Sequence, residues 1–125
     1  MKKFSVKELF LSPQNCGKIE EPDGFGIYGD SECGDYVEVY LKIEDEHITD
    51  IKFLCKGCPT AIALTSLMTI LAKGKHVDDA AEITDEVILD SLEGEISEEK
   101  KHCSNLGAEA LYNALMNYVL KDIES

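Results

Sequence analysis

Three cysteines, at widely separated points of this 125-residue chain, have neighbours that could share in their chemistry. Cys33 lies two residues before Asp35, Cys58 follows a glycine, and Cys103 follows His102. Thiolate, carboxylate and imidazole groups all bind metal ions, and a thiolate is also a nucleophile. The pattern therefore predicts a metal or sulfur site that is assembled from three separate segments.

The five cysteines of the chain are expected to be ligands or reactive thiols rather than disulfide partners. Residues 1–4 are basic but lead into polar residues, so no secretory leader is predicted, and no apolar run is long enough to span a membrane. We therefore expect a soluble, cytoplasmic protein whose reducing surroundings keep its thiols free.

The chain is strongly acidic. Twelve lysines, no arginine and 25 acidic residues give a net charge of −13. Such a charge repels phosphate backbones, which argues against nucleic acid as a partner. It fits cations or basic protein partners, and it also fits the simpler role of keeping the protein soluble.

A pair of strands is predicted between the first two of the three cysteine segments. Residues 36–43 alternate between apolar and polar side chains, and residues 51–55 repeat this period of two. The two segments are therefore predicted to form an antiparallel hairpin with one buried face, and Cys58 follows its end. Another short strand is predicted near residues 25–28, where glycines allow tight turns.

Helices are predicted on both sides of this hairpin in the sequence. Ser5 and Glu8 have the form of a capping box, and Pro13 ends the short helix that they begin. Pro59 suits the first turn of a mostly buried helix, which Gly74 ends.

Two further helices are predicted nearer the C-terminus. Thr84 opens one that Gly94 closes. Ser104 caps the last, whose apolar residues make a stripe of helical period: Leu106, Ala110, Leu111, Ala114, Leu115, Tyr118 and Val119. Strands first and helices later predict a single domain over residues 1–125, an α+β fold in which helices pack on one face of a small antiparallel sheet of about three strands.

These elements would position the reactive groups. Cys58 and Cys103 each immediately precede a predicted helix, whose exposed N–H groups favour the thiolate and so lower the pKa of the thiol. Cys33 and Asp35 point to the same side if the chain is extended there, so that both could bind one ion.

The remaining cysteines and histidines carry weaker signals. Cys55 makes a CxxC motif with Cys58, which is a zinc half-site or a redox pair, although strand alternation also makes Cys55 a small core residue. Cys16 has no partner in the sequence and is expected to be an ordinary thiol. His47 and His76 lie in polar turns and are expected on the surface.

Five segments appear together in a fixed order and spacing from about Phe10 to Tyr118. They are residues 12–17 (SPQNCG), 33–35 (CGD), 53–63 (FLCKGCPTAIA), 72–75 (AKGK) and 101–106 (KHCSNL). A single CGD or CxxC is a weak signal, but the ordered set is specific. With this set the chain resembles the IscU/NifU-type iron-sulfur cluster assembly scaffolds.

The resemblance implies that Cys33, Asp35, Cys58, His102 and Cys103 converge on one exposed pocket. There a [2Fe-2S] cluster would be built from iron and from persulfide sulfur supplied by a cysteine desulfurase, and passed to apo acceptor proteins. The chain would be a scaffold and not an enzyme. Cys103 would receive the persulfide, Asp35 would keep the cluster labile, and zinc could occupy the pocket when no cluster is present.

Some questions stay open in this resemblance. Asp35 and His102 are alternatives for the fourth ligand, and the cluster could lie within one chain or bridge two in a homodimer. Residues 96–100 (ISEEK) stand where chaperone-dependent bacterial members have Leu-Pro-Pro-Val-Lys, which argues against release through a dedicated Hsp70 chaperone. Phe10 replaces a tyrosine of many members, which leaves aromatic packing without a phenol.

Cys16 and Cys55 exceed the usual three cysteines of the family. Either is a candidate for an extra ligand or sulfur carrier, and we expect Cys55 to be too buried for that role. Two other functions compete with the scaffold: a zinc protein with a closed structural Cys/Asp/His site, and a thiol oxidoreductase or sulfurtransferase that uses Cys55 and Cys58.

Overall fold

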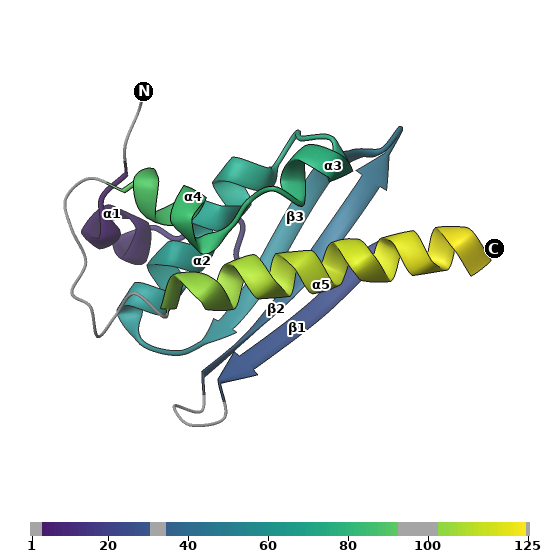
Figure 1. The fold of residues 1–125 in the computed structure, drawn as a ribbon. Helices are drawn as coiled ribbons and strands as arrows, with labels where there is room; N and C mark the ends of the chain where they lie inside the picture. Colours follow the sequence, from purple (N-terminus) through teal and green to yellow (C-terminus); the bar gives the residue numbers. More distant parts are fainter. Residues whose placement is uncertain (1–3, 31–34, 93–102, 125) are drawn as a thin grey trace.

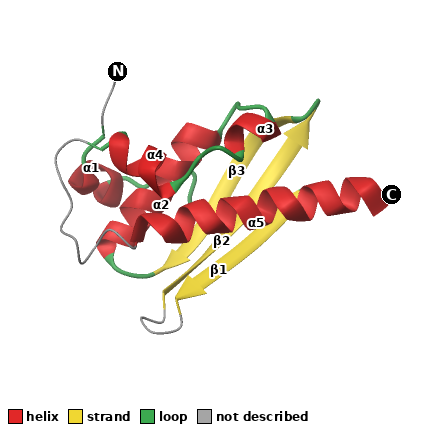
Figure 2. Ribbon diagram, viewed as in Figure 1, coloured by secondary structure: helices red, strands yellow, loops and turns green. Residues whose placement is uncertain are grey.

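Three antiparallel strands form a sheet against which the helices pack, in a computed structural model that describes residues 4–30, 35–92 and 103–124. The sheet has the order β1-β2-β3 (Figures 1 and 2). Its strands are β1 (Gly24–Asp30), β2 (Asp35–Glu44) and β3 (His47–Lys56). The helices are α1 (Val6–Leu11), α2 (Pro59–Ala72), α3 (Val77–Ala80), α4 (Asp85–Asp90) and α5 (Cys103–Glu124). The predicted α+β class and the three-stranded sheet are confirmed.

Helices α2 and α5 cover one face of the sheet, and α1 and α4 pack on α2 (Figure 1). The strand alternation follows the prediction, since the apolar side chains of β2 and β3 on this face are almost completely buried. They are Val37, Val39, Leu41, Ile43, Ile48, Ile51 and Phe53. One residue of the other face differs from the prediction: Tyr40 is also buried, because the ring of Phe25 on β1 lies 5.1 Å from it between centroids.

Helix α2 is buried along most of its length, as predicted, and includes the polar residues Thr65, Ser66 and Thr69. Such residues need hydrogen-bond partners, and two of them find these in the segment before β1. The Ser66 hydroxyl accepts a hydrogen bond from the Gln14 N–H at 2.7 Å, and the Asn15 side-chain amide donates to the Thr69 hydroxyl at 3.0 Å. The predicted end of the helix is confirmed, with Lys73 as the C-cap.

The segment that holds Asn15 also covers the outer edge of β3. The Phe53 N–H donates to the Asn15 carbonyl at 2.9 Å, and the Gly17 N–H donates to the Phe53 carbonyl at 2.8 Å. Asn15 has a φ of 62°, in the left-handed region, which asparagine tolerates better than most residues. Residues 14–17 therefore join α2 to β3.

Strand β1 lies unusually close to α5. A side chain on Gly26 would place its Cβ 2.3 Å from the Ala114 nitrogen and 2.4 Å from the Ala110 carbonyl oxygen, so only glycine fits there. Backbone groups on the outer edge of β1 find their hydrogen-bond partners on the same helix. The Phe25 N–H donates to the Asn117 side chain, and the Asn113 amide donates to the Ile27 carbonyl, each at 3.0 Å.

Several predicted boundaries were wrong. Helix α4 ends at its C-cap Ser91, whose N–H closes a tight turn onto the Ile88 and Leu89 carbonyls, and Gly94 lies outside the described residues. Helix α5 already includes Ser104, which is therefore not its cap. Val119, the last residue of the predicted apolar stripe, is 36% exposed because the end of α5 runs past the sheet (Figure 1).

Two other elements also differ from the sequence prediction. Strand β1 is longer than the predicted segment 25–28. The four-residue helix α3 was not predicted, since its N-cap is His76, whose ring nitrogen accepts from the Asp78 N–H. Within the described residues, no helix has the length and apolar character needed to cross a membrane.

The closeness of β1 and α5 predicts that Gly26→Ala destabilises the fold by about 3 kcal/mol or more, because the new methyl group meets backbone atoms that cannot rotate away. Urea unfolding would measure the change. Gly74→Ala is the control, since it has open space around its Cβ and a φ of 87°, and should cost only about 1 kcal/mol of backbone strain. Equal losses for the two variants would contradict the close approach.

The covering segment predicts a graded response at Asn15. Asn15→Gly keeps the left-handed φ accessible but removes the hydrogen bond to Thr69, for a loss of about 1 kcal/mol in the free energy of unfolding. Asn15→Ala removes the hydrogen bond and also makes the left-handed φ unfavourable, so the free energy of unfolding should fall by about 2–3 kcal/mol. The same unfolding experiment measures both, and an alanine variant as stable as the glycine variant would contradict the role of the backbone conformation.

Candidate functional site

The described parts of the three cysteine segments, which are Asp35, Cys58 and the start of α5, belong to one end of the molecule. Strand β1 ends at Asp30, which pairs with Asp35 at the start of β2, and β3 runs antiparallel to β2 and ends beside this start. Helix α5 begins at the same end (Figure 1). Its Gly107, one turn after Cys103, lies against Thr65 of α2, where a Cβ would be 3.3 Å from the Thr65 Cα. The topology thus brings the starts of β2, α2 and α5 together.

Asp35 lies directly over the turn between β3 and α2. A Cβ on Gly57 would be 3.1 Å from the Asp35 carboxyl carbon, 3.3 Å from one carboxylate oxygen and 3.2 Å from the Ala61 methyl. The space left by Gly57 is therefore filled by the carboxylate of Asp35. Since Gly57 immediately precedes Cys58, the predicted ligands Asp35, at the start of β2, and Cys58, at the N-cap of α2, lie near each other in space.

Cys58 is the N-cap of α2 and has an extended backbone with φ −71° and ψ 164°. Its side chain makes no capping hydrogen bond to the helix. The sulfur is half-buried and lies at the positive end of a 14-residue helix, where backbone N–H groups favour a thiolate. The predicted placement of Cys58 immediately before a helix is confirmed.

Three of the five predicted ligands are described incompletely or lie outside the described residues. Cys33 and His102 lie outside the described residues, and Cys103 is described as the first residue of α5, without its side chain. Cys103 is therefore in the first turn of the helix rather than immediately before it. Among the residues whose side chains are described, no three cysteine, histidine or acidic side chains form a metal-binding group.

Cys55 is half-buried and packs against the core, on the same face of β3 as Phe53. Burial raises the pKa of its thiol to about 11, a hydrogen bond with the Thr65 hydroxyl lowers it, and the nearby charges of Asp35, Cys58 and Cys16 raise it. Cys55 is therefore a protonated thiol at neutral pH. No sequence pattern indicated this role of the Thr65 hydroxyl, because Cys55 lies ten residues away in the chain and on another element.

Cys16 is exposed and lies in the covering segment, where its backbone pairs with Phe53. It is near enough to Cys55 to affect that thiol, so it is less isolated than the sequence indicates. His47 is exposed and His76 half-exposed at the opposite end of the sheet, where their rings meet edge to face at 5.2 Å. Neither histidine belongs to the site.

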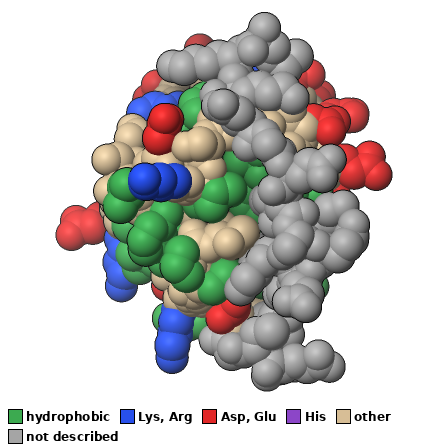
Figure 3. All heavy atoms as spheres, turned by 90° about the vertical axis from the view of Figure 1, so that its left-hand side faces the viewer, with side chains coloured by type: hydrophobic (Ala, Val, Ile, Leu, Met, Phe, Trp, Pro, Cys, Tyr) green, Lys and Arg blue, Asp and Glu red, His purple; other side chains and the backbone are tan. Residues whose placement is uncertain are grey.

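The surface at this end of the molecule is partly apolar. Figure 3 shows it, with apolar side chains gathered in the middle and charged side chains mainly around them. Phe10 and Leu11, at the end of α1, are 39% and 66% exposed. An exposed apolar surface of this kind is typical of a site that contacts other proteins.

The chain matches the model of the NifU-like N terminal domain over residues 2–125. It is 44% identical over 117 residues to the iron-sulfur cluster assembly scaffold protein IscU 1 of Archaeoglobus fulgidus, covering 94% of this chain and 76% of the relative. It is 37% identical to the corresponding IscU of Aquifex aeolicus, with coverages of 93% and 74%. The nitrogen fixation protein NifU of Azotobacter chroococcum is 40% identical, and the match spans 90% of this chain but 37% of NifU.

Two solved structures share the fold. The N-terminal NifU-like protein of Brucella abortus superposes with a TM-score of 0.74 at 21% identity, covering 93% of this chain and 92% of the other. The putative iron-sulfur cluster assembly scaffold protein for the SUF system from Fervidobacterium islandicum gives a TM-score of 0.71 at 23% identity, with coverages of 88% and 93%.

The surroundings of Cys55 predict slow alkylation of the native, metal-free protein. With a pKa of about 11, about one Cys55 thiol in a thousand is ionised at about pH 8, and the rate with iodoacetamide should still rise tenfold per pH unit towards pH 10. Peptide mass spectrometry would follow each cysteine, with the exposed Cys16 as the internal reference. Labelling of Cys55 as fast as Cys16, or a rate that levels off below pH 9, would contradict the prediction.

Proposed function

The chain belongs to the NifU-like N-terminal domain family of iron-sulfur cluster assembly scaffolds, and we propose that it assembles a [2Fe-2S] cluster at the end of the sheet where Asp35 meets Cys58. The observation that carries this proposal is the Asp35 carboxylate seated over Gly57. With the Asp35 carboxylate at the residue that precedes Cys58, a hard oxygen ligand and a soft sulfur ligand would be available together at the start of α2. A site of this mixed chemistry suits a cluster that is held and then released.

The proposed thiolate ligands are Cys33, Cys58 and Cys103. Asp35 and His102 compete for the fourth position, and a carboxylate or imidazole binds cluster iron less firmly than a fourth thiolate. The position of Asp35 next to Gly57 supports its candidacy, because no side chain separates the carboxylate from the turn that holds Cys58.

Sulfur would arrive as a persulfide from a cysteine desulfurase. The thiolate of Cys103 attacks the terminal sulfur, a new S–S bond forms on Cys103, and the desulfurase cysteine leaves as a thiolate. Two electrons from an external reductant then convert the transferred sulfur to sulfide. Apo iron-sulfur proteins would receive the finished cluster, held either within one chain or between two chains of a homodimer.

Two observations bear on the alternative functions. The described core is closed by apolar packing of α2 and α5 on the sheet, and its buried polar side chains have hydrogen-bond partners, which disfavours a structural zinc ion as the group that holds the fold together. The raised pKa of Cys55 disfavours it as the nucleophile of a thiol oxidoreductase. Zinc bound at the same residues of the cluster-free protein remains compatible with the scaffold.

Anaerobic reconstitution tests the proposal. Incubation with ferrous iron, cysteine, a cysteine desulfurase and dithiothreitol should give a coloured protein with the absorption and Mössbauer spectra of a [2Fe-2S] cluster. Cys58→Ser should lose most of this colour because a thiolate ligand is removed, whereas Cys16→Ser, which removes an exposed thiol, should retain it. A colourless parent protein, or a Cys58→Ser variant equal to the parent, would refute the proposal.

Replacing the hard ligand should trap the cluster. Asp35→Cys offers a fourth thiolate, so transfer to an apo-ferredoxin should slow by about tenfold or more, and the cluster should resist chelators longer. Transfer is followed by circular dichroism of the acceptor. Glu38→Cys, which adds a thiol on the outer face of β2, is the control and should transfer at the parent rate. Parent-like transfer by Asp35→Cys would remove Asp35 from the ligand set.

A further inference from the structure

The outer side of α5 carries a stripe of apolar side chains that the described residues leave exposed. Tyr112, Met116, Val119, Leu120 and Ile123 are 50%, 39%, 36%, 52% and 72% exposed. Figure 1 shows the last turns of α5 projecting beyond the sheet. These five residues, here called the α5 stripe, expose large apolar side chains on a protein that is otherwise strongly acidic.

The spacing of the α5 stripe is that of a helix-packing seam. Tyr112, Met116, Val119 and Ile123 follow one another at intervals of four, three and four, which places them on one side of a helix. Ala110 and Ala114, on the opposite side, are fully buried in the core. The stripe spans about 17 Å along the helix axis, enough to contact about three turns of another helix.

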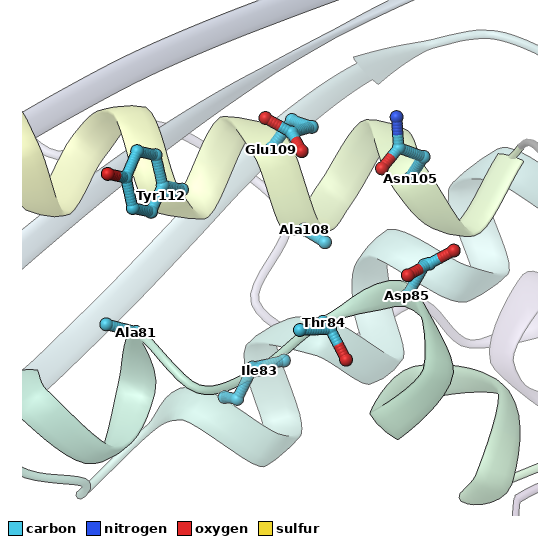
Figure 4. Close-up of a pocket in the computed structure, with 8 residues that line it drawn as sticks. All are labelled: Ala81, Ile83, Thr84, Asp85, Asn105, Ala108, Glu109 and Tyr112. Carbon is cyan, nitrogen blue, oxygen red and sulfur yellow. The ribbon is translucent and has the colours of Figure 1, made fainter.

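A groove of about 230 Å³ continues this surface towards the start of α5. Figure 4 shows it between α5 and the segment that leads from α3 into α4, with Tyr112 common to the groove and the stripe. Ile83 and Ala108 are nearly buried and provide an apolar floor. Asp85, at the start of α4, and Glu109, on α5, are the acidic residues that line the groove, and no lysine is among its described lining residues.

We propose that the groove and the α5 stripe together form a docking surface for an amphipathic helix of a protein partner, with a lysine or arginine that enters the groove. The aliphatic part of such a side chain fits the apolar floor, and its charge fits Asp85 and Glu109. The apolar face of the partner helix would lie on the stripe at the complementary spacing.

Charge selects this occupant over the alternatives. A second copy of the chain would bring a net charge of −13 and the same carboxylates to the contact. An anionic membrane or a nucleic acid would be repelled for the same reason. A basic amphipathic helix is attracted by the carboxylates and buries the apolar stripe.

The surface begins one turn from Cys103, so a partner docked on it would also lie near the proposed cluster site. Docking itself uses neither the cluster nor its ligands. Binding at this surface is therefore independent of cluster assembly, and either can be absent while the other is present.

A designed peptide pair tests the surface on the full chain without a cluster. One peptide is a helix of about 18 residues with leucine at the seam positions and lysine beside them, and the other has glutamate for each lysine. Fluorescence anisotropy should show binding of the lysine peptide and binding weaker by about tenfold or more for the glutamate peptide. The methyl resonance of Met116 should shift on binding, which distinguishes this surface from attraction to the acidic protein as a whole.

Two variants and two matched controls locate the contact. Leu120→Gln in the stripe and Glu109→Gln in the groove should each weaken binding about fivefold or more. Ile27→Gln, at an exposed apolar residue of β1, and Glu20→Gln, at an exposed carboxylate elsewhere, should leave it unchanged. Circular dichroism and cluster reconstitution should be equal for all four.

Three results would overturn the proposal. Equal binding of the two peptides would remove the role of charge, and unchanged binding by both Leu120→Gln and Glu109→Gln would place the contact elsewhere. Dimerisation of the parent chain in sedimentation experiments, abolished by Leu120→Gln, would assign the stripe to a second copy.

Discussion

Most of the structure depends on one contact, the close approach of α5 to β1, because this contact sets the position of the helix on the sheet. Gly26 removes the side chain that would keep the helix away from the strand, and Ala110 and Ala114 present their backbone to the space that it leaves. The helix can then cover β1 and β2 while its first turn reaches α2 through Gly107. This packing fixes Cys103, at the start of α5, at the same end as Asp35 and Cys58.

The sequence predicted the parts of the fold that repeat with a regular period. The alternation in β2 and β3, the proline in the first turn of α2 and the end of α2 could be predicted because each follows from local chemistry. The exact start of α5 and the burial of Tyr40 depend on neighbours far away in the chain. The cap of α3 was missed because histidine is an uncommon N-cap, so its ring nitrogen gave no local signal.

For the candidate site, the sequence indicated residue types and said less about their arrangement. Residue types and spacing predicted that Asp35 and Cys58 carry chemistry, and Gly57 stood out only as the glycine before Cys58, where the missing side chain leaves space. The structure fills that space with the Asp35 carboxylate, a contact between the start of β2 and the end of β3 that follows from strand register. Cys55 was placed on the buried face by alternation, and this burial is the main cause of the raised pKa of its thiol. The hydrogen bond with Thr65, which lowers the pKa, and the charge of Asp35, which raises it, come from residues that no local pattern connects to Cys55.

Both outer edges of the sheet are occupied by the chain itself. Residues 14–17 pair with the edge of β3 at Phe53, and the side chains of Asn113 and Asn117 bond the backbone of β1. An unpaired edge is a template on which another chain can add a strand, which leads to aggregation or to recognition by strand addition. The chain is thereby protected from non-specific strand pairing at these positions. A protein that approaches the sheet there meets side chains and helix surfaces instead of free backbone groups.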